Sequence, residues 1–166
     1  MRSSVSCSRN ESAPRGLSLL ELLVVLVIIA IGVTLAVPNF SYWIEKYTIW
    51  KAARQLVTDL QLAKMRAVSQ GLQHRVYFDS GTRSYRIEQG NAPHGSTMWS
   101  QIGSIRALSD PQNPHYAKGV TMATNFANNA VIFSTKGTAS PAGTVTLTSP
   151  NYARHVTVIL TGRVRS

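Results

Sequence analysis

The sequence predicts an α+β protein in which a long N-terminal helix, half membrane-spanning and half amphipathic, packs on a small antiparallel β-sheet head. Three observations predict this fold class: a continuous apolar segment, an amphipathic period that follows it, and a series of short strand candidates separated by Pro, Gly and Asn. We expect four parts, which are a polar segment at residues 1–16, a membrane helix at 17–37, an amphipathic helix at 38–71 and a β-rich head at 72–166.

The apolar segment runs from Leu22 to Val37, and Thr34 is its only polar residue. A helix from Leu17 to Val37 would be roughly 30 Å long, about the thickness of the hydrocarbon core of a bilayer. It has no polar face for water, and a chain of this size offers little protein to bury it, so we expect a membrane span. A charged side chain such as that of Glu21 costs free energy beside an apolar membrane segment. Glu21 therefore marks either a functional position or a carboxylate in the headgroup layer.

The amphipathic helix follows Pro38, which we expect to bend or interrupt the helix because it lacks a backbone donor. The pattern ends near Gly71. We expect its aromatic start to serve both as an interfacial belt and as packing surface under the sheet, with the first group nearer the lipid. Apolar residues recur here every three or four positions, at Phe40, Trp43, Ile44, Tyr47, Trp50, Ala53, Val57, Leu60 and Ala67.

Beyond Gly71 the sequence predicts strands. Residues 74–78 and 85–88 read as a hairpin with a Gly-containing loop. Pro, Asn, Ser and Gly separate the remaining candidates, so we expect one small sheet domain without a repeat. These candidates are residues 98–102, 105–108, 120–122, 131–134, 144–148 and 154–161.

The chain carries 17 basic and 7 acidic residues, a net charge of +10. This excess favours an anionic partner, nucleic acid or phospholipid headgroups, although solubility alone would also explain it. The four histidines share no metal-ligand spacing, and Cys7 is the only cysteine. The sequence also lacks a Gly-x-Ser-x-Gly elbow and a Gly-rich phosphate loop. We therefore expect no enzyme activity, metal, cofactor or small-molecule substrate.

The stretch Gly16-Leu17-Ser18-Leu19-Leu20-Glu21, with the apolar run after it, resembles the processing site of type IV pilins and type II secretion pseudopilins. The resemblance implies that a prepilin peptidase cuts after Gly16 and that the new N-terminal residue, Leu17, is methylated. Leu17 stands where the family usually has Phe. The resemblance also implies that Glu21 attracts the positively charged N-terminus of a neighbouring subunit, which registers that subunit in the growing filament.

Residues 1–16 are then a leader that carries Arg2, Arg9 and Arg15. Positive residues before an apolar segment keep that end in the cytoplasm. We therefore expect a single-pass protein of the inner membrane with its C-terminal head in the periplasm, which later joins a pilus or pseudopilus with other pilins or pseudopilins.

The C-terminal part, including residues 131–138, 143–147, 154–160 and 162–165, resembles the GspH/FimT domain of minor pilins. In FimT-type pilins a terminal Gly-Arg-x-Arg element is associated with DNA capture in natural transformation, and Arg163 and Arg165 match its two arginines. Residues two apart in an extended segment project to one side, and Arg forks fit phosphate oxygens. With Arg154 and Lys136 they would form a basic stripe that binds the DNA backbone rather than a base sequence.

The resemblance leaves the secretion or pilus system open. We favour a type IV pilus minor pilin that captures DNA. The alternative is a GspH-like minor pseudopilin of a type II secretion system, in which the terminal arginines close the sheet or contact a neighbouring subunit. A third class is a bitopic membrane protein with a basic, lipid-facing head that does not polymerise.

Overall fold

The computed structural model describes residues 18–166, apart from the side chains of residues 35–39. The chain divides into two units, residues 1–39 and 40–166. Within the described part of the chain, no helix combines the length and apolarity that crossing a membrane requires. The predicted membrane helix at 17–37 includes residue 17 and the side chains of 35–37, which lie outside the described part.

Helix α1 is a single element, Leu19–Gln70. It continues through Pro38, so the interruption expected at this residue is absent from the helix. It ends at Gln70, directly before Gly71 and near the predicted end, and the φ of +65° at Gly71 is a left-handed conformation that Gly adopts without a Cβ penalty.

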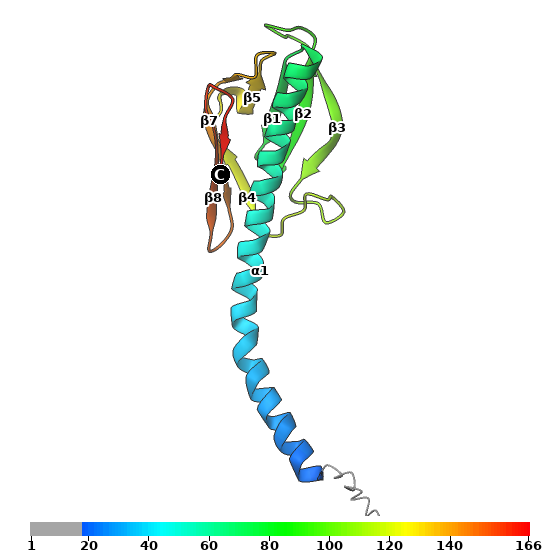
Figure 1. The fold of residues 1–166 in the computed structure, drawn as a ribbon, viewed down its shortest axis with the longest axis vertical. Helices are drawn as coiled ribbons and strands as arrows, with labels where there is room; N and C mark the ends of the chain where they lie inside the picture. The colour runs from blue at the N-terminus through cyan, green and yellow to red at the C-terminus, as the bar shows by residue number, and fades with distance from the viewer. Residues whose placement is uncertain (1–17) are drawn as a thin grey trace, which may run out of the picture. The chain divides into compact units, whose positions relative to one another are not determined.

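The strands after α1 form two antiparallel sheets beside the C-terminal half of the helix (Figure 1). One sheet has the order β3-β2-β1-β5-β6 and the other the order β4-β7-β8-β9, with a 3-10 helix, η1, before β5. The elements are β1 (His74–Asp79), β2 (Ser84–Gly90), β3 (Trp99–Ala107), β4 (Thr121–Thr124), η1 (Ala127–Asn129), β5 (Ala130–Phe133), β6 (Ala139–Ser140), β7 (Gly143–Thr148), β8 (Ala153–Val158) and β9 (Val164–Arg165).

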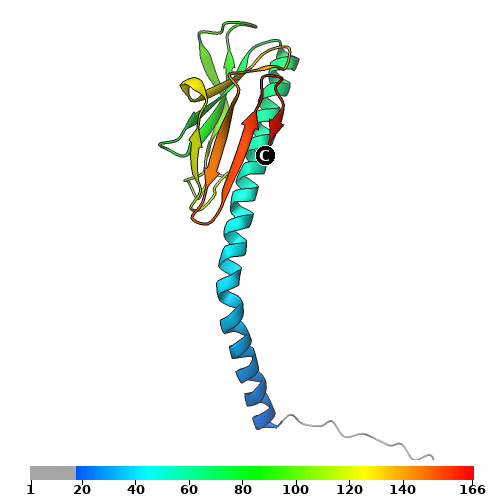
Figure 2. The ribbon, with the colours of Figure 1, turned by 90° about the vertical axis from the view of Figure 1, so that its left-hand side faces the viewer.

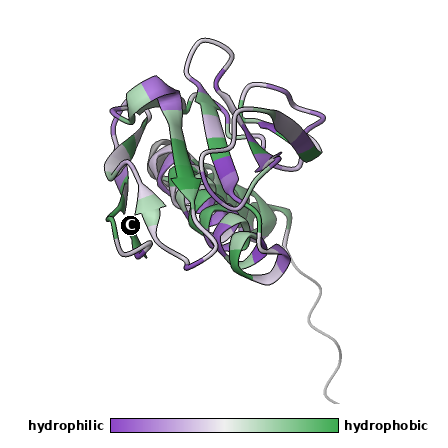
Figure 3. Cartoon of the chain, turned by 90° about the horizontal axis from the view of Figure 1, so that it is seen from above, coloured by the Kyte–Doolittle hydropathy of each residue, from purple (hydrophilic) through white to green (hydrophobic). Residues whose placement is uncertain are grey.

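The structure confirms the predicted hairpin as β1 and β2 and corrects three other expectations. The two candidates at 98–102 and 105–108 are one strand, β3. Strand β8 ends at Val158, because the chain turns back over residues 159–162 to form the short strand β9. The head contains two sheets rather than one, and the break after β6 lets the strands curve around one side of α1, as the view from above shows (Figure 3).

The core lies between one face of α1 and both sheets. The helix supplies seven buried apolar residues, of which four are alanines, and their small side chains let the strands approach the helix closely. Because the whole core lies between residues 49 and 158, residues 40–166 form a unit that can fold without the N-terminal segment. The buried apolar residues of the helix are Ile49, Ala52, Ala53, Leu56, Leu60, Ala63 and Ala67.

The aromatic start of the amphipathic helix does not pack under the sheets. The side chains of Phe40, Trp43 and Tyr47 are each 61% exposed, and that of Trp50 is 41% exposed. The sequence pattern places Trp50 on the buried face of the helix, and this prediction is wrong. The neighbouring residue, Ile49, enters the core instead. Of the two roles considered, packing under the sheet is excluded for Phe40, Trp43 and Tyr47.

A buried carboxylate ties α1 to the first sheet and to the loop after β3. Asp59 accepts hydrogen bonds from the Tyr85 hydroxyl (2.9 Å) and from Arg106 Nε (3.0 Å), and His115 Nε2 lies 3.4 Å from the same oxygen. These three partners come from β2, β3 and the following loop, so one helix position fixes three segments of the head. Burial lowers the pKa of His115, although the nearby Asp59 charge opposes this shift.

Candidate nucleic-acid interface

The last two residues of the terminal Gly-Arg-x-Arg element, Val164 and Arg165, form the edge strand β9, which lies beside α1 (Figure 2). Val164 pairs with Val158 of β8 and packs against the core, whereas Arg163 and Arg165 are exposed. Because side chains alternate along an extended segment, Arg165 in β9 and Arg163 directly before it project from the side opposite Val164. The structure thus gives the two arginines the common side that the sequence predicted.

A tight turn positions Arg163. Gly162, at a φ of +71°, precedes it, and the Gly162 amide donates to the Ile159 carbonyl (2.8 Å). A Cβ at Gly162 would stand against the Gly137 carbonyl oxygen, closer than van der Waals contact allows. The turn before β9 is therefore seated on the turn that contains Gly137, and only Gly fits at this contact.

Lys64 of α1 locks the same two turns together. Its Nζ donates to the Gly162 carbonyl (3.1 Å), and its aliphatic end lies next to Gly137. Sequence reasoning did not include Lys64 in the site. The available signal was its position four residues after the core residue Leu60, which places it on the flank of the buried helix face.

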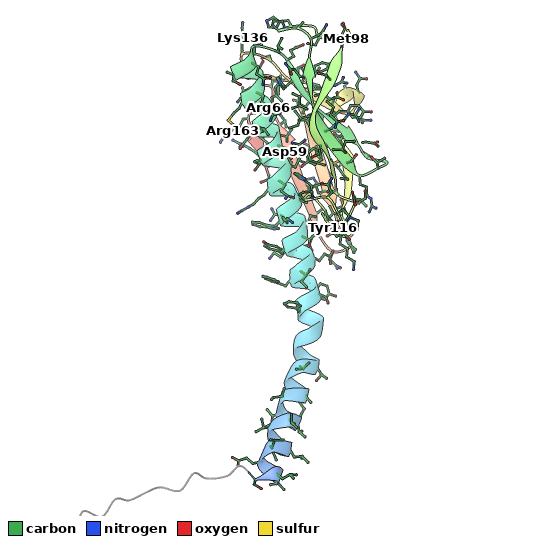
Figure 4. All side chains as sticks on the ribbon, turned by 90° about the vertical axis from the view of Figure 1, so that its right-hand side faces the viewer. Asp59, Arg66, Met98, Tyr116, Lys136 and Arg163 are labelled. Carbon is green, nitrogen blue, oxygen red and sulfur yellow. The ribbon has the colours of Figure 1, made fainter. Side chains whose placement is uncertain are left out.

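Lys136 is exposed in the turn that carries Gly137. Within this turn the Gly137 amide donates to the Ser134 carbonyl (2.9 Å), and the Ser134 amide donates to the Thr138 carbonyl (2.9 Å). The contact between Gly137 and Gly162 brings this turn to the turn before Arg163, so Lys136 and Arg163 lie on adjoining turns on the same side of α1 (Figure 4).

Arg154 has a different environment from the other predicted residues. It pairs with the buried Leu147 in the β7–β8 ladder, so its side chain leaves the sheet on the core side. Its guanidinium lies over the Trp50 ring of α1, 4.2 Å from the ring centroid. Arg165 pairs with Thr157, whose side chain lies on the other face. Arg154 therefore lies on the opposite face of the second sheet from Arg165, and the predicted stripe of four residues is not continuous.

The five acidic side chains of residues 40–166 have partners other than the candidate DNA-binding residues. Glu88 is paired with Arg75 and Arg86, and Asp59 with Arg106. The other three carboxylates accept hydrogen bonds from nearby amides: Glu45 from Asn151, Asp79 from Gly81 and Thr82, and Asp110 from Gln112.

These pairings leave most of the basic residues without a counter-charge. Of the 14 Lys and Arg residues after residue 16, 11 form no ion pair within residues 18–166. Arg163, Arg165, Lys136 and Lys64 are among the 11, so their positive potential can act on an external anion.

The N-terminal candidate site is described only in part. Glu21 lies in the first turn of α1 with its side chain exposed. Gly16 and Leu17, the predicted cleavage and methylation residues, lie outside the described residues. Among residues 18–166, no group of three His, Cys, Asp or Glu side chains is arranged to bind a metal ion.

Two family models match the sequence. The model of the type II transport protein GspH matches residues 52–162, and the prokaryotic N-terminal methylation motif matches residues 12–37. A search of curated protein sequences gives no significant match.

Two solved structures show a similar fold. One is the minor pseudopilin EpsH from the type 2 secretion system of Vibrio cholerae, at 19% identity and a TM-score of 0.51, covering 68% of this chain and 90% of that chain. The other is the type IV minor pilin FimU of Pseudomonas aeruginosa, at 19% identity and a TM-score of 0.52, covering 74% of this chain and 90% of that chain. At these identities the likeness concerns the fold alone.

Proposed function

Because this chain belongs to the GspH family of type II transport proteins and carries the prokaryotic N-terminal methylation motif, we propose that it is a type IV minor pilin that captures DNA. The family and the motif make it a minor pilin or pseudopilin, which a prepilin peptidase processes and which assembles with other pilins. The assignment to a pilus, the DNA partner and the roles of single residues are the proposal.

The N-terminal part of the proposal concerns assembly. Cleavage after Gly16 exposes the amine of Leu17, and residues 17–37 anchor the protein in the inner membrane with its head in the periplasm. Glu21 then pairs with the N-terminal amine of a neighbouring subunit. An ammonium and a carboxylate that meet in a low dielectric lose much of the penalty that each carries alone.

The C-terminal part concerns DNA, and one observation carries it. Arg165 in the edge strand and Arg163 directly before it lie on the same side of the terminal segment, exposed and without an ion pair within residues 18–166. Each guanidinium can donate two parallel hydrogen bonds to a phosphate. Lys136 adds a third positive charge on the adjoining turn, whereas Arg154 is engaged with Trp50 and is not part of this site. No base-reading group is proposed, so binding is independent of sequence.

A minor pseudopilin of a type II secretion system is the second candidate. The contact that favours it is the seating of Gly162 on Gly137, because it gives the Gly of the terminal element a structural role that needs no DNA. In that case Arg163 and Arg165 contact a neighbouring subunit.

DNA binding by residues 40–166 tests the proposal. The fragment should bind unrelated DNA sequences with similar affinity, and the affinity should fall steeply as salt rises. Each lost phosphate contact lowers the salt slope by about 0.7 to 0.9, so Arg163→Ala with Arg165→Ala should lower it by roughly 1.4 to 1.8. Both arginines are exposed, so the melting temperature should hardly change.

A matched control separates a site from overall charge. Lys51→Ala with Lys118→Ala removes two exposed charges from other parts of the head and should leave the salt slope nearly unchanged. Undiminished DNA binding by the folded double arginine variant would refute the proposed site. So would a loss of affinity that only follows a loss of folding, which is expected if the two arginines close the sheet.

A further inference from the structure

An exposed aromatic stripe lies on the part of α1 that belongs to the unit of residues 40–166. We define it as Phe40, Trp43, Tyr47 and Trp50, which follow one another at three or four residues and therefore share one side of α1. Their side chains are 41–61% exposed, whereas the opposite side of the same helix segment supplies Ile49 to the core. Large contiguous apolar patches of this kind mark interaction sites in soluble domains.

Basic side chains border the aromatic stripe. A surface hollow of about 540 Å³ lies along it, with Lys46, Lys51 and Arg54 in its wall. Arg154 reaches it from β8 and covers the Trp50 ring, and Arg54 lies 5.9 Å from the same ring centroid. The neighbouring acidic residue, Glu45, accepts hydrogen bonds from the side-chain amide and the backbone amide of Asn151. These hydrogen bonds lower the pKa of Glu45, and the bond from the Asn151 side chain has the largest effect. The partner of the stripe should therefore be apolar and anionic at once.

Nucleic acid is one partner with a planar apolar part and an anionic part, but the ring geometry disfavours it. Phe40 and Trp43 stack at a centroid distance of 6.1 Å and an interplanar angle of 22°. Trp43 and Tyr47 stack at 5.8 Å and 12°. Together with Arg154 over Trp50, these contacts cover ring faces on which bases would need to stack.

A lipid surface fits the same features. Trp and Tyr rings prefer the interface between water and hydrocarbon, and Lys and Arg next to them bind anionic headgroups. A stripe with aromatic residues in the middle and basic residues at the borders has the arrangement of helices that lie in this interface. In the sequence, the stripe begins three residues after the apolar run that ends at Val37.

We propose that the aromatic stripe and its basic border bind the head to anionic phospholipid headgroups, independently of Arg163 and Arg165. This surface would keep the head on the membrane before the subunit enters a filament. The ligand class is an anionic glycerophospholipid in a bilayer, and the binding requires no DNA and no second subunit.

Vesicle co-sedimentation of residues 40–166 tests this proposal without the apolar helix, which would bind any bilayer. The fragment should bind phosphatidylcholine vesicles that contain about one third phosphatidylglycerol, and bind pure phosphatidylcholine vesicles far more weakly. Lys46→Ala with Lys51→Ala should weaken binding about fivefold for each residue. Trp43→Ala with Tyr47→Ala should weaken it on the order of tenfold for each ring that leaves water.

Two controls make the result specific to the stripe. Met98→Ala with Leu160→Ala removes two exposed apolar side chains elsewhere and should leave vesicle binding unchanged. Arg163→Ala with Arg165→Ala should also bind vesicles as wild type does.

In a Trp99→Phe background, emission from the two stripe tryptophans should shift to shorter wavelength when anionic vesicles are added, as expected for rings that enter the interface.

Three outcomes would overturn the proposal. The first is undiminished vesicle binding by the folded Trp43→Ala, Tyr47→Ala variant. The second is equal binding to neutral and anionic vesicles. The third is a stripe variant that binds vesicles normally but loses DNA binding or self-association, which would assign the stripe to nucleic acid or to a second subunit. Because the altered side chains are exposed, a melting curve should confirm that each variant is folded.

Discussion

Gly162→Ala is expected to destabilise the head more than a Gly substitution at a comparable backbone conformation. Gly162 has a φ of +71°, and a Cβ there would overlap the carbonyl oxygen of Gly137. Gly119 has nearly the same φ, +73°, but nothing lies within 4 Å of the position of its Cβ. The pair therefore separates the cost of the left-handed backbone from the cost of the contact between the two turns.

The left-handed conformation costs a residue with a Cβ about 1.5 kcal/mol. At Gly162 the overlap must also push the turn of Gly137 away, and overpacking of this kind adds about 2 kcal/mol. We therefore expect Gly119→Ala to lower the free energy of unfolding by about 1.5 kcal/mol and Gly162→Ala by about 3.5 kcal/mol. For a domain of this size each kcal/mol corresponds to about 4 °C, so the melting temperatures should fall by about 6 °C and 14 °C.

Thermal melts of residues 40–166, followed by circular dichroism, measure the difference directly. Lys64→Met gives an independent check, because it keeps the aliphatic contact next to Gly137 but loses the hydrogen bond to the Gly162 carbonyl. It should cost about 1 kcal/mol. If Gly162→Ala and Gly119→Ala melt within two or so degrees of each other, the seating of one turn on the other is wrong.

The other predictions concern processing, assembly and pH. Intact-mass measurement of the membrane-extracted protein should show the loss of residues 1–16 and the addition of one methyl group at Leu17, and a mature form that keeps Arg15 would contradict this. Glu21→Ala should insert into the membrane normally, because the helix becomes more apolar, but should enter filaments less; equal co-purification with filaments would exclude the pairing role. Burial lowers the pKa of His74, whose Nε2 has no hydrogen-bond partner within residues 18–166. The folded state thus binds fewer protons than the unfolded state, and stability should fall as the pH drops below about 6.5. Urea midpoints across this range should show a shallower fall for His74→Gln than for the wild type, and an equal fall would contradict the assignment to His74.

Local signals were sufficient for several parts of the fold. Gly71 as the helix end and the β1–β2 hairpin depend on residues close in sequence, so the pattern alone predicts them. The two-residue strands β6 and β9 could not be predicted in this way, because they exist only through pairing with β5 and β8.

The helix face and the site needed tertiary information. Trp50 and Ile49 both fit a period of three to four residues, and only the position of the sheets decides that Ile49 is buried. Alternation along a strand predicts the common side of Arg163 and Arg165. The different side of Arg154 follows from the pairing of Val158 with Val164, which the sequence does not specify.

The most direct test of the central claim is DNA uptake by the native cell when the chromosomal copy carries Arg163→Ala and Arg165→Ala. Labelled DNA that becomes resistant to external nuclease measures uptake, and mass spectrometry of sheared filaments measures incorporation of the subunit. We predict that uptake falls strongly while incorporation stays at the wild-type level, because both arginines are exposed and lie outside the core. Uptake at the wild-type level by a normally incorporated variant would contradict DNA capture by this subunit.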